Sequence, residues 1–212
     1  MEKTCGAKRF ANLDRVSVLS LAFLLIFTAF NSADNLAAKV LREDGFAGLG
    51  FYSMAALYLV FAITGFVSKG LVRKLSGKSE SLRFPMFIGG LCYFVRILFF
   101  LLPAYFKTES HSWLTSPTSI TVLIIVTAML NGFGAGILWV AQGEYLSLCA
   151  SEETKGFYFS YFFVIFMISQ IIGNLVAGFV IRLSGQPTYY WSMSGLSLVG
   201  CFVFLVLQAP RK

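Results

Sequence analysis

Six long apolar runs divide this sequence, and only short polar stretches separate them. Each run approaches or exceeds roughly 20 residues, the length that an α-helix needs to cross about 30 Å of hydrocarbon. The runs are continuously apolar and do not alternate with a period of two, which argues against a β-barrel. The predicted spans are 16–38, 48–68, 84–105, 119–145, 157–183 and 189–208.

The composition agrees with a location in the membrane. Hydrophobic residues make up 57% of the 212 residues and charged residues 13%, and the mean hydropathy is +0.76. A water-soluble domain needs a more polar exterior than this. Because the connections between the runs are short, the sequence predicts an all-α membrane protein in which residues 1–212 form a single membrane domain.

The net charge of +7 reflects how basic residues are distributed among the connections. If the N-terminus and the C-terminus are both cytoplasmic, twelve Lys and Arg residues fall on the cytoplasmic side and four on the other. This bias satisfies the positive-inside rule and predicts an integral membrane protein with both termini in the cytoplasm. The basic residues share no helix face and do not alternate with aromatic residues, so a nucleic-acid partner is not expected.

No sequence pattern here is typical of catalysis or of cofactor binding. The four cysteines have no CxxC spacing, and His111, the one histidine, has no second histidine at metal-ligand spacing. We find no Ser/His/Asp arrangement, no HExxH motif and no P-loop. We therefore expect neither an enzyme nor a cofactor or metal site.

Three polar residues near the end of the first predicted span share one helix face. Asn31, Asp34 and Asn35 follow i, i+3, i+4 spacing. Since charged groups at membrane depth usually face a partner or water, this face is the first candidate for a cavity or a partner surface. Asp34 also lies close to the outer end of the span, where a solvated helix end explains it equally well.

Arg96 is the clearest charge inside a predicted span. An unpaired Arg at that depth costs about 2.5–3.5 kcal/mol on insertion scales, so we expect it to have a partner. Asp34 is the carboxylate at comparable depth on the same half of the membrane, while contacts with backbone carbonyl groups or snorkelling of the side chain towards the interface are alternatives.

Gln142 lies near the cytoplasmic end of the fourth predicted span, close to Trp139. Either it belongs to an interfacial anchor, as Trp and Tyr do at the headgroup level, or it faces an internal cavity. In the fifth span, Gln170 and Asn174 lie one turn apart and are expected to hydrogen-bond to a neighbouring helix.

Small residues recur at four-residue spacing in two of the spans. Gly132 and Gly136 form one such pair, and Gly173 and Ala177 form another. Residues four apart share one helix face, and small side chains there let a neighbouring backbone approach closely. The glycines lie inside an apolar helix and not in a strand-to-helix turn, so helix packing is predicted and nucleotide binding is not.

Four segments resemble a known family. The chain reads FTAFNSADNL at 27–36, EDGFAGLGFYSMAALY at 43–58, GAGILWVAQGEYLSLCASEETKG at 134–156 and SQIIGNLVAGFV at 169–180. In this order they are similar to the Unc-ninety-three family, known as ion-channel regulatory proteins. The resemblance implies a major-facilitator-type half, in which six transmembrane helices form an inverted three-plus-three repeat.

The same resemblance implies a protein that acts on partners, such as potassium channels or other membrane proteins in transit. Ordinary facilitators resemble G-x-x-x-D-R-x-G-R after the second span, whereas this chain reads GLVRKLSGK at 70–78, with Lys74 in place of the acidic residue and Leu75 in place of the basic one. Family members usually have twelve spans, so this chain is expected to be a fragment, to pair with a second copy of itself or to dock on another protein.

Three functions are compatible with this sequence. The leading hypothesis is a scaffold or regulator of another membrane protein, which acts through faces of small residues. The second is a homodimeric solute transporter of the major-facilitator type, in which Asn31, Asp34, Asn35 and Gln142 face a shared cavity. The third is an accessory subunit of a larger organelle membrane complex. All three place the chain in the lipid bilayer.

Overall fold

The computed structural model describes residues 10–77, 81–106 and 113–211, and all regular structure in these ranges is helical. Five helices, with α4 and α5 taken together, are long and apolar enough to cross a membrane. The protein is thus an all-helical, multi-pass membrane protein. The elements are α2 (Leu13–Glu43), α3 (Leu49–Ser76), α4 (Arg83–Phe99), α5 (Leu101–Phe106), the 3-10 turn η2 (Trp113–Thr115), α6 (Pro117–Cys149) and α7 (Lys155–Val206).

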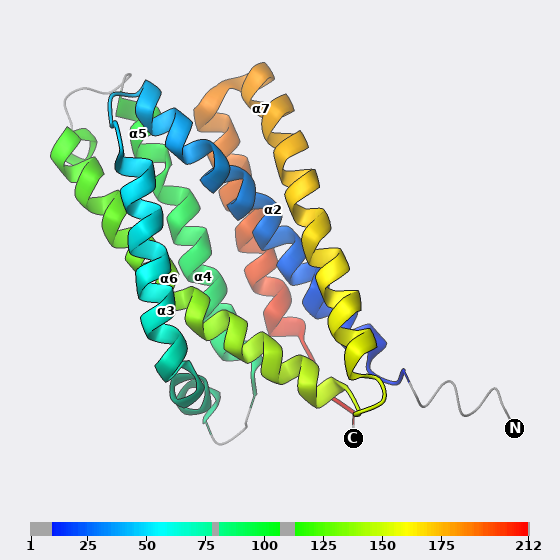
Figure 1. The fold of residues 1–212 in the computed structure, drawn as a ribbon. Coiled ribbons are helices and arrows are strands. Elements are labelled where there is room, and N and C mark those ends of the chain that lie inside the picture. Colours follow the sequence, from blue (N-terminus) through cyan, green and yellow to red (C-terminus); the bar gives the residue numbers. More distant parts are fainter. Residues whose placement is uncertain (1–9, 78–80, 107–112, 212) are drawn as a thin grey trace, which may run out of the picture.

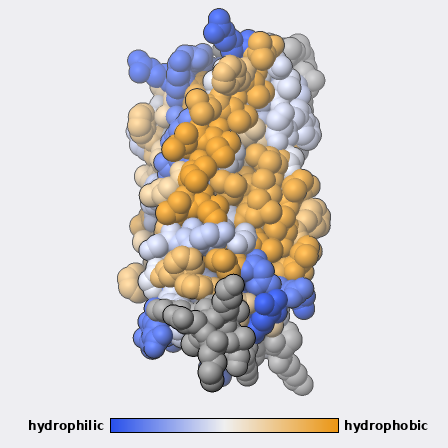
Figure 2. All heavy atoms as spheres, turned by 90° about the vertical axis from the view of Figure 1, so that its right-hand side faces the viewer, coloured by the Kyte–Doolittle hydropathy of each residue, from blue (hydrophilic) through white to orange (hydrophobic). Residues whose placement is uncertain are grey.

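The long helices run side by side in one bundle (Figure 1). Phe10 and Arg211, the two ends of the described chain, lie at the same end of the bundle, which we call the terminal end. The opposite end carries the connection between α2 and α3 and the bend in α7. Figure 2 shows one face of the molecule, where apolar residues occupy the middle and hydrophilic residues gather towards both ends. This pattern is typical of a protein that crosses a bilayer.

The last helix, α7, is 52 residues long and folds back on itself at Gly185. The backbone there has φ 79° and ψ 175°, a region that is essentially restricted to glycine. Pro187 follows two residues later and lacks the N–H that would continue the helix. Both arms, on either side of Gly185, pack against α2, through Gly173 in the first arm and Gly200 in the second (Figure 1).

The helices extend beyond the apolar runs that predicted them, most of all α3, and the third run is divided between α4 and α5. α3 continues to Ser76, beyond the predicted end at residue 68, and its last turn contains Arg73 and Lys74. Basic side chains there interact favourably with the carbonyl end of the helix, so the helix outlasts its apolar run. α4 ends at Phe99. Four residues later, Pro103 has no N–H to donate to the Phe99 carbonyl oxygen, so the helix is interrupted and the short α5 follows.

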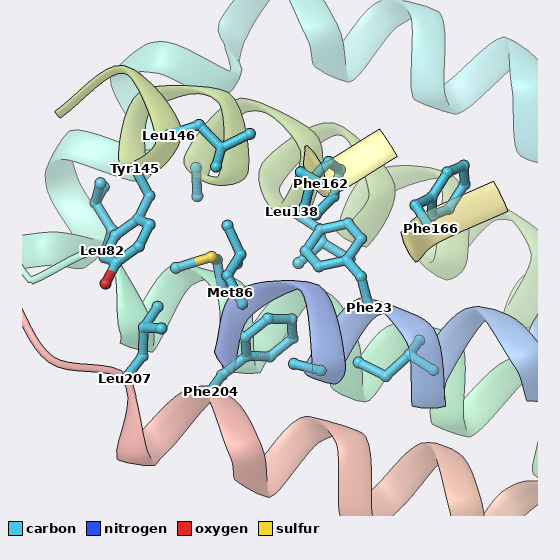
Figure 3. Packing of buried hydrophobic residues seen from close by; sticks show 14 of the residues in the cluster. Phe23, Leu82, Met86, Leu138, Tyr145, Leu146, Phe162, Phe166, Phe204 and Leu207 are labelled. Carbon is cyan, nitrogen blue, oxygen red and sulfur yellow. The ribbon is translucent and has the colours of Figure 1, made fainter. Parts of the chain in front are cut away.

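The core at the terminal half of the bundle is built around Phe23 of α2 (Figure 3). Its ring lies 4.9 Å from that of Phe162 and 5.8 Å from that of Phe204, and both pairs are edge-to-face. Phe162 and Phe204 come from the two arms of α7, while Leu138 of α6 and Met86 of α4 complete the surroundings in Figure 3. The core therefore joins both arms of α7 to three other helices.

Asn12 connects four segments at the terminal end. Its Nδ2 donates to the carbonyl oxygens of Cys149 at 3.0 Å and Arg211 at 3.2 Å, and its Oδ1 accepts from the Arg211 N–H at 2.8 Å. Its own backbone N–H donates to the hydroxyl of Tyr158 at 3.3 Å. The start of α2, the end of α6, the start of α7 and the residues after α7 are thus held together by one buried amide.

We expect Asn12→Ala to lower the free energy of unfolding by about 1–3 kcal/mol, because it leaves buried backbone groups without partners. Asp14→Ala is the matched control, since Asp14 also contacts Arg211, at 2.7 Å, but through a half-exposed ion pair. Such pairs contribute about 0–1 kcal/mol. Thermal unfolding in detergent should therefore separate the two variants, and equal midpoints would contradict the assignment.

Candidate functional site

The two charges predicted inside the membrane meet in the interior of the bundle. Arg96 of α4 is 0% exposed, and its Nη2 lies 3.4 Å from Oδ1 of Asp34 in α2. The same guanidinium donates to the Ser53 hydroxyl of α3 at 2.9 Å and to the Ile124 carbonyl of α6 at 2.8 Å. Its carbon Cζ lies 4.5 Å from the centre of the Phe100 ring. One side chain thus contacts α2, α3 and α6 from its place on α4.

This arrangement decides between the alternatives for Arg96. The side chain does not snorkel to an interface, because it is fully buried and takes an ion-pair partner and a backbone carbonyl at the same time. In a low-dielectric interior, these contacts offset part of the cost of removing a charge from water, while the Arg96 Nε has no hydrogen-bond partner among the described residues. Asp34 is likewise buried and is no solvated helix end. The pair therefore joins helices within the bundle.

The other two residues of the predicted polar face lie outside this interior. Asn35 is exposed and donates from Nδ2 to Oδ1 of Asn174 at 3.3 Å, between α2 and the first arm of α7. One turn away, Asn31 donates to the Ser169 hydroxyl at 3.5 Å, and Gln170 is exposed beside it in sequence. We call Asn31, Asn35, Gln170 and Asn174 the amide stripe. The stripe follows the junction between α2 and the first arm of α7.

A cleft of about 250 Å³ adjoins this stripe and is formed by α2, α3, α4, α6 and the first arm of α7. Asn31 and Gln170 belong to both features. Seven of the eleven residues that line the cleft are aromatic, and we call it the aromatic cleft. Its aromatic residues are Phe27, Phe30, Tyr58, Phe61, Tyr93, Trp139 and Phe166.

Several pairs of neighbouring rings of the cleft are almost perpendicular to one another. The planes of Phe27 and Phe166 differ by 78°, those of Phe30 and Tyr93 by 88°, and those of Trp139 and Phe166 by 86°. Aromatic pairs favour such edge-to-face contacts, so the rings stabilise one another as they form the walls. The cleft is thus a rigid aromatic surface with two amides at its edge.

Two amides of α6 lie in the interior of the bundle. Gln142 is 3% exposed and is not among the residues that line the aromatic cleft, so the structure does not bring it to Asn31 and Asn35. Its Nε2 has no hydrogen-bond partner among the described residues. The same holds for both amide atoms of Asn131, which is 0% exposed.

The predicted small-residue pairs lie at close contacts between helices of the same chain. A Cβ added to Gly132 would collide with the carbonyl oxygen of Leu57 in α3, and one added to Gly136 would lie 2.6 Å from Cγ2 of Thr64. Gly173 faces the backbone of α2 in the same way, and Ala177 is buried. These faces are already occupied, and they are not free for a partner as the leading hypothesis required.

Several residues of the site were not predicted from the sequence. Ser53 looked like an ordinary small residue of an apolar run, and nothing in its neighbourhood marked it as a ligand of Arg96. The cleft aromatics were hidden by the abundance of Phe, Tyr and Trp, which make up 17% of the chain. Tyr58 and Tyr93 carried a signal, since both fall near the middle of predicted spans, whereas Tyr is enriched at membrane interfaces.

The chemistry available at the amide stripe and the aromatic cleft is recognition by hydrogen bonds and ring faces. None of the lining residues of the cleft carries a formal charge, a thiol or an imidazole. Within the described ranges, no three His, Cys, Asp or Glu side chains are grouped so that they could hold a metal ion. His111 and Cys5 lie outside the described residues.

Comparisons with known proteins connect this architecture to one family. The family described as "Ion channel regulatory protein UNC-93" matches residues 46–212. The UNC93-like protein MFSD11 of Xenopus tropicalis is 28% identical over 93% of this chain and 42% of its own length. Protein unc-93 homolog A of Bos taurus is 30% identical over 80% of this chain and 34% of its own length.

A further relative is the putative potassium channel regulatory protein unc-93 of Caenorhabditis elegans, 30% identical over 79% of this chain and 22% of its own length. The chain thus spans less than half the length of these relatives. No solved structure matches it. The family match covers four of the five long helices, α3, α4 with α5, α6 and α7. This chain belongs to the UNC-93 family of ion channel regulatory proteins.

Proposed function

We propose that this chain is a membrane-embedded docking unit, which regulates or scaffolds another membrane protein and does not itself carry a solute. The amide stripe is the observation that carries the proposal. Asn35, Gln170 and Asn174 are exposed on helices that are long and apolar enough to cross a membrane. Polar groups at membrane depth face protein or a water-filled cavity, since lipid offers them no hydrogen-bond partner.

A helical partner that presents polar side chains would satisfy these amides. Hydrogen bonds between transmembrane helices contribute about 0.6–2 kcal/mol each, and several along one stripe would fix both affinity and register. The family description and the name of the Caenorhabditis elegans relative agree with a role on a channel. The partner in this proposal is another membrane protein, and a second copy of the chain is the alternative occupant.

The distribution of charge argues for docking over transport. Asp34 and Arg96 are engaged with one another inside the bundle and are not among the residues that line the aromatic cleft. The cleft therefore offers no charged side chain that could couple a proton or an ion to a solute. Lys74, at the position where the resemblance to facilitators requires an acidic residue, is exposed at the terminal end.

The docking unit in this proposal is a single domain with six membrane crossings, arranged as the inverted three-plus-three repeat of a major-facilitator half. A straight helix of 52 residues would extend about 78 Å, far beyond a hydrocarbon core of about 30 Å. Its bend at Gly185 supports counting α7 as two crossings. Both described ends then lie on one side of the membrane.

That side is the cytoplasm in our proposal. Seven described Lys and Arg residues lie at the terminal end and three at the opposite end. Cytoplasmic connections carry the excess of basic residues in membrane proteins. The terminal-end group is Arg15, Lys69, Arg73, Lys74, Arg83, Lys155 and Arg211, and the opposite group is Lys39, Arg42 and Arg182. Lys3, Lys8, Arg9, Lys78, Lys107 and Lys212 lie outside the described residues.

The test combines native mass spectrometry of gently solubilised membranes with a double variant, Asn35→Leu and Asn174→Leu. Leucine is favourable in lipid, so the variant should insert and fold while the partner complex is lost. Thr121→Leu and Ser192→Leu are the controls, because these exposed hydroxyl groups donate to carbonyl groups of their own helices. The controls should retain the complex.

Retention of the same complex by the double variant would refute docking through the amide stripe. A mass of two copies would identify self-association, and several foreign subunits would identify a larger complex. Uptake of a solute by the purified chain in proteoliposomes would favour the transporter instead.

A further inference from the structure

We propose that the aromatic cleft binds a small organic ammonium ion, with a quaternary or alkylated nitrogen held against the ring faces and its polar group at the amides. This inference goes beyond the docking function and does not depend on it. The cleft lies beside the amide stripe, with which it shares Asn31 and Gln170.

The lining of the cleft determines the charge of a suitable ligand. The faces of aromatic rings carry partial negative charge, and Trp attracts cations more strongly than Tyr or Phe does. Trp139, Tyr58 and Tyr93 are all among the lining residues, together with four phenylalanines. No Lys or Arg lines the cleft, so an anion would meet negative ring faces without a counter-charge.

The geometry of the rings matches the recognition of a compact cation. The ring planes differ by 78° between Phe27 and Phe166 and by 86° between Trp139 and Phe166, so the rings that line the cleft are set at several orientations. Aromatic cages of this kind hold quaternary ammonium groups, which have no N–H to lose to water and spread their charge over methyl groups.

The two amides add acceptors at the edge of the cage. Asn31 donates from Nδ2 to the Ser169 hydroxyl. This hydrogen bond orients the amide group and does not use its acceptor oxygen, Oδ1. Gln170 follows Ser169 directly in sequence and also lines the cleft. A hydroxyl or N–H group of the ligand can donate to such carbonyl oxygens.

The bundle already stabilises one desolvated cation with an aromatic ring, since the Arg96 guanidinium lies 4.5 Å from the centre of Phe100. Arg96 is held there by Asp34 and Ser53, so it does not enter the cleft. The volume of about 250 Å³ is just below the range of roughly 300–1,000 Å³ that holds drug-sized ligands, which selects a smaller ion.

The experiment measures binding of radiolabelled choline to the purified chain in nanodiscs, without any partner. Tetramethylammonium should displace the label, whereas 3,3-dimethylbutan-1-ol, the uncharged carbon isostere of choline, should compete at least about tenfold more weakly. Equal competition by the isostere would show that shape and not charge is recognised and would overturn the proposal. Absence of saturable choline binding would overturn it as well.

Variants locate the binding site. Trp139→Leu should weaken choline binding at least about fivefold, while Trp191→Leu, an exposed tryptophan outside the cleft, should leave it unchanged. Should Trp139→Leu fail to fold, Tyr58→Leu replaces it, because that ring is 57% exposed. Unchanged affinity in the folded cleft variant would refute the site. Partner capture plays no part in this measurement, so either proposal can fail alone.

Discussion

Arg96→Leu is expected to lower the free energy of unfolding by roughly 3–5 kcal/mol. The variant removes a guanidinium that contacts the Asp34 carboxylate, the Ser53 hydroxyl and the Ile124 carbonyl. It leaves a buried carboxylate without its counter-charge. The measurement is unfolding by heat or by denaturing detergent, followed by size-exclusion chromatography.

The matched control removes both charges. In the double variant Arg96→Leu and Asp34→Leu, no unpaired ion remains, so it should recover part of the stability that Arg96→Leu loses. A single variant as stable as the wild type would show that the pair contributes little. A double variant less stable than the single one would show that the unpaired Asp34 carboxylate is not the cause of the loss.

Gly132→Ala is expected to destabilise the protein by about 1–3 kcal/mol, although alanine is normally the better helix former. The added methyl group would collide with the Leu57 carbonyl oxygen and lie 3.0 Å from the Phe61 nitrogen. These are backbone atoms, so α3 and α6 must move apart. Larger residues such as leucine should prevent folding at this position.

Gly143→Ala, on the same helix, is expected to change the free energy of unfolding in the opposite direction. Nothing lies within 4 Å of a Cβ added at Gly143, so the substitution should stabilise the protein by about 0.5–1 kcal/mol through the propensity of alanine. Thermal midpoints that shift in opposite directions would establish that the contact with α3 causes the loss. A shift in the same direction for both variants would contradict the packing of α6 on α3.

The sequence was most informative where a residue type is rarely tolerated in lipid. A buried Arg demands a partner, and Asp34 was the carboxylate at matching depth, so the pair was one of three alternatives for Arg96. The structure realises two of them together, because the guanidinium has enough donors for a carboxylate and a backbone carbonyl.

The sequence was least informative about which way the polar side chains of each helix point. Asp34 and Asn35 are neighbours in the chain, yet one faces the interior and the other the amide stripe, since successive residues of a helix point about 100° apart. Spacing placed Asn31, Asp34 and Asn35 on one broad face and could not divide it. Gln142 was grouped with them by polarity alone, and the structure places it elsewhere.

The sequence by itself determined that this protein is helical, that it lies in a membrane and to which family it belongs. Long apolar runs leave the backbone no other way to satisfy its hydrogen bonds in lipid. Only the tertiary structure decided which polar groups neutralise one another, which remain exposed and which rings line a common cleft. Those outcomes depend on the rotation of each helix about its axis and on contacts between segments far apart in the chain. Because the helices are apolar on most sides, the sequence pattern does not define which face of a helix is buried.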